Sequence, residues 1–368
     1  MTDRHKAQPH GWIILDKPVG LGSTQAVGAV KRNFREAGYG KVKVGHGGTL
    51  DPLAEGVLPI ALGEATKLAG RMLDASKVYE FTIQFGAETD TLDAEGEVVE
   101  RTDRRAPRAV IPAVLEHFTG GIEQLPPAYS AIKVDGRRAY DRVRGGEAVE
   151  MKVRRVTVHS LQILPGTGRG VVGEADGGGD SQPSAADAAI PLHQPAAGPP
   201  PRYGEDLTST FATTSGRPDP FDPAAPLELA DSITLVAHVS KGTYIRSLAR
   251  DIARALGTLG QVTYLRRIKA GPFTEQQAIS LDRLNEIGKG ASLHDLLLPL
   301  EAGLDDIPAL QLTPESAQAV RQGRVLSGMP HDDGLYLAKL ADTPMALMEV
   351  AGGDARVVRG FNIHDVAE

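Results

Sequence analysis

The sequence predicts an α+β protein that ends in a small β-rich module. Several segments alternate apolar and polar residues with period two, which indicates strands, and others repeat apolar residues at helical spacing. After about residue 300, short apolar segments separated by glycines indicate a compact β-rich module, such as a small barrel. The 368 residues, of which 41% are hydrophobic and 24% charged, suffice for two globular cores.

The N-terminal part is expected to start with a strand at residues 12–15. A helix should follow to about Arg35, and either Ser23 or Thr24 can cap its first turn. Further along, a helix is predicted at residues 63–73 and a period-two strand at residues 77–85. Residues 86–96 are rich in acids, but their spacing does not match a twelve-residue calcium loop, so we expect a solvated hairpin loop.

The remaining elements alternate between strands and helices. We predict a helix at residues 111–118, strands at 153–164, 227–239 and 262–269, a helix from Ile245 that stops at Gly257, and two helical pieces within 276–298. In the C-terminal module we predict a short helix at 315–321 and strands at 334–340, 345–350 and 355–363. Residues 165–226 are dominated by Gly, Pro, Ala, Ser and Asp, which indicates a disordered insertion between two strands.

Charge is unevenly distributed along the chain. The net charge of −7 argues against a polyanionic partner, and residues 275–368 carry fifteen acids against seven bases. Between residues 124 and 155, however, eight basic residues face only four acids. The Asp135-Gly136 pair predicts a hairpin here, at about residues 124–152, with basic and aromatic residues interleaved near its tip. Such a projection suits a nucleic-acid backbone and unstacked bases, although an ordinary solvated hairpin explains the segment equally well.

Residues 44–58 form a glycine-rich loop that presents the carboxylate of Asp51 before a proline. Taken alone, this pattern is more typical of a surface turn than of a catalytic site. The absence of cysteine excludes disulfides and thiolate chemistry, and the sequence has no phosphate-binding lysine loop, zinc helix or nucleophile elbow. A carboxylate can act as a covalent nucleophile, and Arg246 at a strand-to-helix junction is a candidate partner for its charge. A structural ion pair is the alternative for Arg246, and a core aromatic is the alternative for Tyr79.

Six motifs resemble those of the bacterial tRNA pseudouridine-55 synthases of TruB type. The active-site motif matches at residues 45–56, and the others match in family order at residues 15–20, 77–79, 126–133, 240–246 and 264–267. Together they span most of residues 11–275, which makes a chance match not credible. The resemblance implies a pseudouridine-synthase domain at residues 11–295, built on a mixed, mainly antiparallel sheet with flanking helices. It also implies a PUA-like module at residues 300–368, and it makes the basic hairpin at 124–152 a thumb-like clamp.

The implied activity is isomerisation of one uridine of the tRNA T-loop, at position 55, to pseudouridine by base flipping. The resemblance assigns the nucleophile to Asp51, its charge partner to Arg246, and stacking on the flipped uracil, with assistance to proton removal, to Tyr79. It implies that Tyr244 and Leu265 line the base pocket, and that His46 packs against the opened T-loop. It further implies RNA contacts from the basic hairpin through Lys133, Arg137, Arg138 and Arg142.

The resemblance also sets expectations for partners. The partner is the T-arm of tRNA, and no cofactor, metal or guide RNA is expected. We expect a cytoplasmic protein, because no apolar run approaches the length of a membrane span and residues 1–10 lack a signal-peptide core. We also expect a monomer. The chain departs from the family in two places. Gly47 stands where the family usually has Thr, which is expected to loosen the loop, and the insertion at 165–226 has no counterpart in compact members.

Two other functions remain open at this point. A guide-RNA-dependent sister branch shares the motifs, and a non-catalytic RNA-binding protein would share the basic surface. Asp51 separates the last possibility from an enzyme, because a pure binder needs no carboxylate in its pocket.

Overall fold

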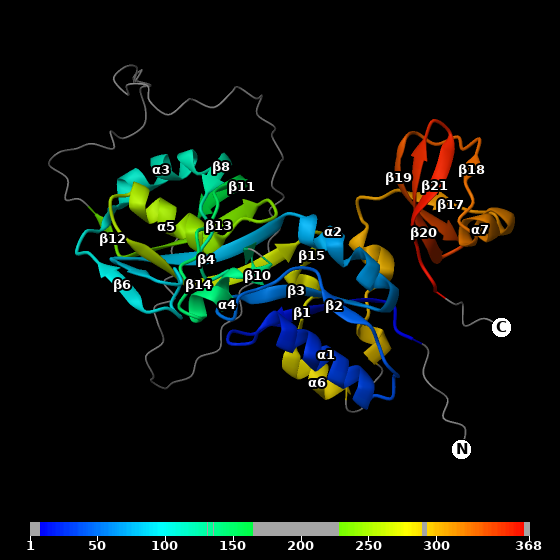
Figure 1. Ribbon diagram of the computed structural model, residues 1–368, viewed down its shortest axis with the longest axis horizontal. Helices are drawn as coiled ribbons and strands as arrows, with labels where there is room; N and C mark the ends of the chain where they lie inside the picture. Colours follow the sequence, from blue (N-terminus) through cyan, green and yellow to red (C-terminus); the bar gives the residue numbers. More distant parts are fainter. Residues whose placement is uncertain (1–7, 131, 135, 165–227, 289–292, 364–368) are drawn as a thin grey trace, which may run out of the picture. The chain divides into compact units, whose positions relative to one another are not determined.

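The computed structural model describes residues 8–130, 132–134, 136–164, 228–288 and 293–363 (Figure 1). The predicted insertion at 165–226 lies outside the described residues. The main sheet consists of β1 (Gly11–Lys17), β2 (Val44–His46), β3 (Glu55–Leu62), β4 (Lys77–Phe85), β8 (Gly120–Gln124), β11 (Arg154–Ile163), β13 (Ser232–Val239), β14 (Gly260–Ala270), β15 (Phe273–Thr274) and β16 (Ile279–Ser280).

The strand order in this ten-stranded sheet is β16-β1-β3-β14-β4-β13-β11-β8, with β2 paired to β3 and β15 paired to β14. Only β1–β16 and β3–β14 run parallel, so the sheet is mixed and mainly antiparallel, as expected. Three two-stranded ladders accompany it: β5 (Ala87–Thr89) with β6 (Val98–Arg101), β7 (Ala106–Pro107) with β12 (Leu229–Ala230), and β9 (Lys133–Val134) with β10 (Arg137–Arg138).

Helices flank the main sheet. They are α1 (Ser23–Glu36), α2 (Ala69–Asp74), α3 (Ile111–His117), α4 (Ala139–Arg144), α5 (Ile245–Ala255) and α6 (Leu281–Gly288), with 3-10 turns at Gly63–Leu68, Arg108–Val110, Glu275–Gln277, Leu293–Leu296 and Leu300–Gly303. Figure 1 shows α1 and α6 side by side, and the amide of Asn33 on α1 donates to Asn285 on α6 at 2.9 Å. The α+β class is therefore confirmed.

The core beneath α5 explains why the central strands and this helix form as predicted. Alternate residues of β4, including Phe81 and Ile83, are buried together with Leu248 and Ile252, which lie one turn apart on α5. The helix ends at Ala255, and Gly257 then adopts φ +74°, a conformation that favours glycine.

Three local predictions were wrong. Ser23 does not cap α1, because the cap position is Gly22 and the Ser23 hydroxyl bonds the backbone of Leu50 instead. The second half of the predicted basic hairpin is the short helix α4, so only β9 and β10 are extended. Residues 86–96 are not a simple solvated loop, because Leu92 and Asp93 are buried and contact Val262 of β14.

The C-terminal module is a five-stranded sheet with one helix. It comprises β17 (Ala309–Gln311), α7 (Pro314–Arg321), β18 (Leu326–Ser327), β19 (Gly334–Leu340), β20 (Thr343–Ala351) and β21 (Asp354–Gly360). Its strand order is β17-β19-β20-β21-β18, and α7 packs on the sheet through Ala317 and Val320. The β-rich module is confirmed, whereas the domain boundaries 11–295 and 300–368 stay a prediction. No helix in the described part of the chain combines the length and apolar character that a membrane span requires.

Candidate active site

The loop between β2 and β3 carries Asp51, and polar side chains hold its backbone on both sides. The Ser23 hydroxyl accepts a hydrogen bond from Leu50 N at 2.8 Å and donates to Leu50 O at 2.9 Å. On the other side, Gly20 N donates to Pro52 O at 2.9 Å. The residues before and after Asp51 are therefore both fixed to the segment that joins β1 to α1.

Lys17 is a second anchor of this loop. Its side chain is fully buried, and its Nζ donates to the carbonyl oxygens of Pro18 at 2.9 Å, Leu21 at 2.6 Å and Pro52 at 3.3 Å. Burial lowers the pKa of Lys17 to about 8, while the negative charge of nearby Asp51 acts in the opposite direction. Sequence reasoning assigned no role to this lysine, although it lies in one of the six motifs.

Asp51 and Arg246 form the ion pair that was proposed from the sequence. Arg246 Nη2 lies 2.7 Å from Asp51 Oδ2, and the guanidinium is almost completely buried while the carboxylate is partly exposed. Arg246 is the second residue of α5, so the first turn of this helix directs it toward the loop. Its Nη1 also donates to Thr91 O at 2.9 Å, and its Nη2 donates to Tyr129 O at 3.1 Å.

Asp93 is a buried carboxylate behind this pair that sequence reasoning missed. Its Oδ2 lies 3.2 Å from Arg246 Nη1, and only 2% of its side chain is exposed. Its Oδ1 accepts hydrogen bonds from Thr91 Oγ1 at 2.6 Å and from Glu95 N at 3.1 Å. A buried arginine between two carboxylates is oriented from both sides. The acid-rich loop at 86–96 therefore belongs to the site rather than to the solvated surface.

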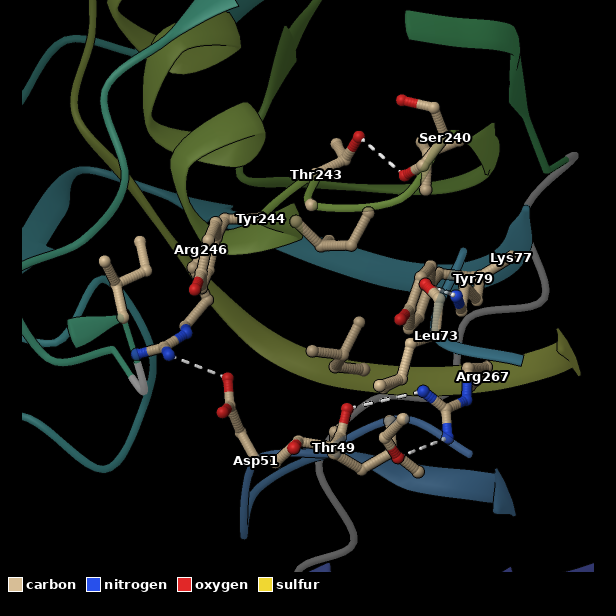
Figure 2. Close-up of a pocket in the computed structure, with 18 residues that line it drawn as sticks. Thr49, Asp51, Leu73, Lys77, Tyr79, Ser240, Thr243, Tyr244, Arg246 and Arg267 are labelled. Carbon is tan, nitrogen blue, oxygen red and sulfur yellow. Dashed lines mark hydrogen bonds and ion pairs between the residues drawn. The ribbon is translucent and has the colours of Figure 1, made fainter. Parts of the chain in front are cut away.

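A cavity of about 330 Å³ opens beside the ion pair and brings five of the predicted residues together (Figure 2). The five are Asp51, Tyr79, Tyr244, Arg246 and Leu265. They come from the β2–β3 loop, from β4, from the start of α5 and from β14. These segments are distant in sequence, but β14 pairs with both β3 and β4, which brings them to one place.

Tyr244 is held at the N-terminal cap of α5 by a buried glutamine. The side chain of Gln124 accepts from Tyr244 N at 2.8 Å and donates to Tyr244 O at 3.1 Å. Burial raises the pKa of the Tyr244 phenol, which therefore stays neutral at physiological pH. Gln124 was assigned to the basic hairpin in the sequence analysis, but in the structure it ends β8 and fixes a residue that lines the cavity.

Two buried cations complete the wall of the cavity opposite Asp51. Arg267 donates through Nε to Val57 O at 2.7 Å and through its Nη atoms to Thr49 O and Gly48 O, both at 3.4 Å. Lys77 Nζ donates to three carbonyl oxygens at the end of α2, and burial lowers its pKa to about 8, with the charge of Arg267 adding to the shift. Sequence reasoning assigned neither residue to the site.

His46 ends β2, and Gly47 begins the same loop. His46 does not line the cavity; its Nδ1 accepts from Gly48 N at 3.4 Å, and burial followed by the charge of Arg267 lowers its pKa. Gly47 is buried, and a Cβ added there would stand 2.5 Å from Met72 Cβ. The absence of a side chain at Gly47 thus lets α2 pack closely against the loop. Whether glycine also loosens the loop stays a prediction.

The basic side chains of the hairpin lie outside the cavity, which Ile132 of this segment lines, and they largely contact other residues of the hairpin. Glu147 accepts from Arg137 Nη1 and from Arg142 Nε, both at 2.8 Å. Arg138 Nη1 donates to Tyr140 Oη at 2.9 Å, and its guanidinium stands 5.8 Å from the centre of that ring. Lys133 is exposed on β9. Among the described residues no group of three or more His, Asp and Glu side chains is arranged to hold a metal ion.

Family comparisons agree with this geometry. Residues 35–174 match the model of the TruB family pseudouridylate synthase N-terminal domain, and residues 246–305 match that of the tRNA pseudouridylate synthase B C-terminal domain. A tRNA pseudouridine synthase B of Novosphingobium aromaticivorans is 56% identical over 97% of this chain and 99% of its own length. The chain belongs to the TruB family. A second TruB relative, from Zymomonas mobilis, is 50% identical over 96% of each chain.

Solved structures show the same fold at lower identity. An H/ACA RNP bound to a substrate RNA containing 2′-deoxyuridine matches with a TM-score of 0.60 and 21% identity, over 97% of this chain and 86% of the other. A Cbf5-Nop10-Gar1 complex matches with a TM-score of 0.59 and 23% identity, over 96% of this chain and 85% of the other. The pseudouridine-synthase architecture expected for a TruB protein is therefore confirmed over nearly the whole chain.

Proposed function

We propose that this chain is a tRNA pseudouridine synthase that isomerises one uridine of the T-loop, at position 55. The observation that carries the proposal is the Asp51 carboxylate, which faces a cavity and is paired at 2.7 Å with the buried guanidinium of Arg246. The TruB relatives described above are named tRNA pseudouridine synthase B, which supports tRNA as the substrate.

The reaction rearranges bonds within one nucleotide. The C1′–N1 glycosidic bond breaks, the uracil turns within the cavity, and C5 bonds to C1′. The proton that leaves C5 is balanced by the proton that N1 gains, and no electron or external group is transferred, so the proposal needs no cofactor. Asp51 supplies the nucleophile that holds the intermediate covalently at an electron-poor carbon of the nucleotide.

The shape of the cavity supports base flipping. Its lining is partly aromatic and apolar, through Tyr79, Tyr244 and Leu265, and its size lies in the range of small-ligand pockets. A uridine stacked in an RNA loop reaches such a cavity only by leaving its stack, and side chains then replace the lost stacking. Tyr79 stacks on the flipped uracil and assists removal of the C5 proton. Tyr244 and Leu265 enclose the base.

Arg246 and Asp93 position the nucleophile. Arg246 touches Asp51 directly, and Asp93 holds the other edge of the same guanidinium. A charge-assisted hydrogen bond to a buried guanidinium fixes the direction of the attacking carboxylate. Asp93 acts through Arg246 and does not reach the cavity, so it is a positioning residue.

RNA contacts outside the cavity fall to the basic hairpin and to His46. Lys133, Arg137, Arg138 and Arg142 bind phosphates of the T-arm, and His46 packs against the opened loop. Exposed cations on a projecting hairpin provide this kind of sequence-independent contact. The enzyme acts as a monomer, and the T-arm itself presents the target, so no guide RNA takes part.

The test is to incubate the purified protein with an unmodified tRNA transcript, without guide RNA, and to map pseudouridine by nucleotide position. The wild type is expected to modify the T-loop uridine. Asp51→Asn keeps the shape of the side chain but removes the nucleophile, and it should lower the rate by at least about a thousandfold. Binding of the tRNA by this variant should stay within about threefold of the wild type, because the basic surface is intact.

A matched control is Asp306→Asn, which makes the same change at an exposed carboxylate bonded to Arg71, outside the catalytic cavity. This control should retain wild-type activity. Product that forms only with an added guide RNA would contradict the proposal of a stand-alone enzyme. Full activity of Asp51→Asn would remove Asp51 from the role of nucleophile.

A further inference from the structure

Leu73, at the end of α2, is an exposed apolar residue inside the catalytic cavity. Half of its surface is accessible, whereas the preceding Met72 is only 3% exposed. A leucine exposed on an open surface is common and needs no explanation. Leu73 instead lines the same cavity as Tyr79 and Leu265, and Figure 2 shows it among the side chains that face the open space.

The backbone beneath Leu73 is held firmly. Lys77 Nζ donates to Met72 O at 2.8 Å, Leu73 O at 2.8 Å and Ala75 O at 2.6 Å, which ties down the carbonyls at the end of α2. On the other side, Met72 packs so closely on Gly47 that the loop has no room for a Cβ there. Leu73 is therefore presented by a fixed backbone, although its side chain is half exposed.

An ion pair joins the next residue to the opposite wall of the cavity. Asp74 Oδ1 accepts from Lys241 Nζ at 2.9 Å, and both side chains are mostly exposed. Lys241 precedes Gly242 and Thr243, which line the cavity across from α2. Leu73 thus stands just inside a charged edge, where an apolar side chain would be buried by a ligand that fills the cavity.

We propose that Leu73 is a substrate-contacting residue, and that its side chain packs against the nucleotide that enters the cavity. The inference rests on the proposed function, because the occupant is the flipped nucleotide. A nucleobase face and a leucine side chain are both apolar surfaces, so their contact removes area from water on binding. Lys77 and Gly47 are positioning residues for this contact, since they fix the backbone that presents Leu73.

The test compares Leu73→Ala, Leu73→Met and Leu229→Ala in steady-state kinetics with unmodified tRNA. Leu73→Ala removes most of the contact and should lower kcat/KM by about tenfold, mainly through a higher KM, because the lost apolar contact is a binding contact. Leu73→Met keeps the volume and should stay within about twofold of the wild type. Leu229, on β12, is 52% exposed and lies outside the cavity, so Leu229→Ala controls for loss of an exposed leucine.

Thermal unfolding of the three variants distinguishes the loss of a substrate contact from a loss of protein stability. Equal unfolding temperatures for Leu73→Ala and Leu229→Ala, together with a raised KM only for the former, support the inference. A KM for Leu73→Ala equal to that of the wild type, or no rescue by Leu73→Met, would overturn it while leaving the proposed function intact. Absence of pseudouridine with the wild-type protein would instead overturn the proposed function first.

Discussion

Asp51 owes its position to contacts with the backbone around it. The Ser23 hydroxyl fixes Leu50, and Lys17 and Gly20 N both bind Pro52 O, so the carboxylate projects from a backbone that is held on each side. Within the described residues, the side chain itself forms an ion pair with Arg246. These backbone contacts hold the proposed nucleophile in place, while its side chain lines the cavity.

Gly47 tests how tightly this loop is packed. Gly47→Ala adds one Cβ at 2.5 Å from Met72 Cβ, so the loop or α2 must move apart. We expect the free energy of unfolding to fall by about 1–3 kcal/mol, the usual effect of overpacking, and kcat/KM to fall with it. Urea unfolding and the tRNA assay measure the two effects.

Gly45→Ala is the control for this change, because a Cβ at Gly45 meets nothing within 4 Å. In a double-mutant cycle, Met72→Gly should reduce the loss of stability that Gly47→Ala causes. The reason is that Met72→Gly removes the Met72 Cβ that the new alanine Cβ would meet. Equal effects of Gly45→Ala and Gly47→Ala would show that close packing on Met72 is unimportant.

Among the secondary-structure elements, those with a strong periodicity of apolar residues could be predicted from the sequence. The period-two strand β4 and the amphipathic helix α5 formed where the pattern placed them, since their own residues decide which face is buried. The prediction of a solvated loop at 86–96 was wrong because Asp93 is buried and paired with Arg246, a distant partner that local sequence does not reveal. Similarly, Ser23 resembled a helix cap, but Leu50 competes for its hydroxyl.

The basic hairpin makes a prediction about salt. In the structure Arg137 and Arg142 share Glu147, whereas Arg138 is exposed and donates to the hydroxyl of Tyr140. Arg138→Ala should therefore weaken tRNA binding and reduce the slope of log affinity against log salt by about one, as for one lost phosphate contact. Filter binding at several salt concentrations measures this slope.

The matching control is Arg283→Ala, which removes an exposed arginine from α6, far from the hairpin in sequence. This variant should leave the slope unchanged. An unchanged slope for Arg138→Ala would indicate that its guanidinium does not contact a phosphate in the complex.

At the scale of the whole molecule, Lys17 couples folding to pH. Its pKa is about 8 in the folded protein and 10.5 when free. Below about pH 8 the folded and the unfolded protein both hold this proton, so the full cost of burying the charge lowers the free energy of unfolding. As pH rises from about 8 to 10.5, the folded state releases its proton first, and the contribution of Lys17 to the free energy of unfolding increases. Each pKa unit is worth about 1.4 kcal/mol, so the gain is at most about 3 kcal/mol.

The measurement is urea unfolding of the wild type and of Lys17→Met between pH 7.5 and 10.5. The two pKa values place the expected change between about pH 8 and 10.5. The difference between the two proteins isolates Lys17 from other groups that titrate in this range. We expect the wild type to gain stability relative to Lys17→Met as pH rises. A constant difference would show that the folded pKa is not lowered.

The candidate site as a whole was only partly predictable from the sequence. Taken alone, its loop left Asp51 as a surface turn, and residue chemistry offered Arg246 only as a candidate partner. The family resemblance supplied the roles of Tyr79, Tyr244 and Leu265, and the structure places all five residues around one cavity. Lys77 and Arg267, which donate hydrogen bonds to backbone carbonyls of the site, were missed. A buried cation that binds carbonyls has no signature in the sequence. Their roles depend on the pairing of β14 with β3 and β4.

The sheet also has a consequence for how this chain can change during evolution. Leu164 N, at the end of β11, donates to Thr234 O on β13, so the chain leaves and re-enters the sheet at neighbouring points. The length of sequence between these points can grow, shrink or be exchanged by recombination without shifting the register of either strand. Lineages can therefore acquire new segments at this position while Tyr244 and Arg246, encoded downstream, keep their places beside Asp51.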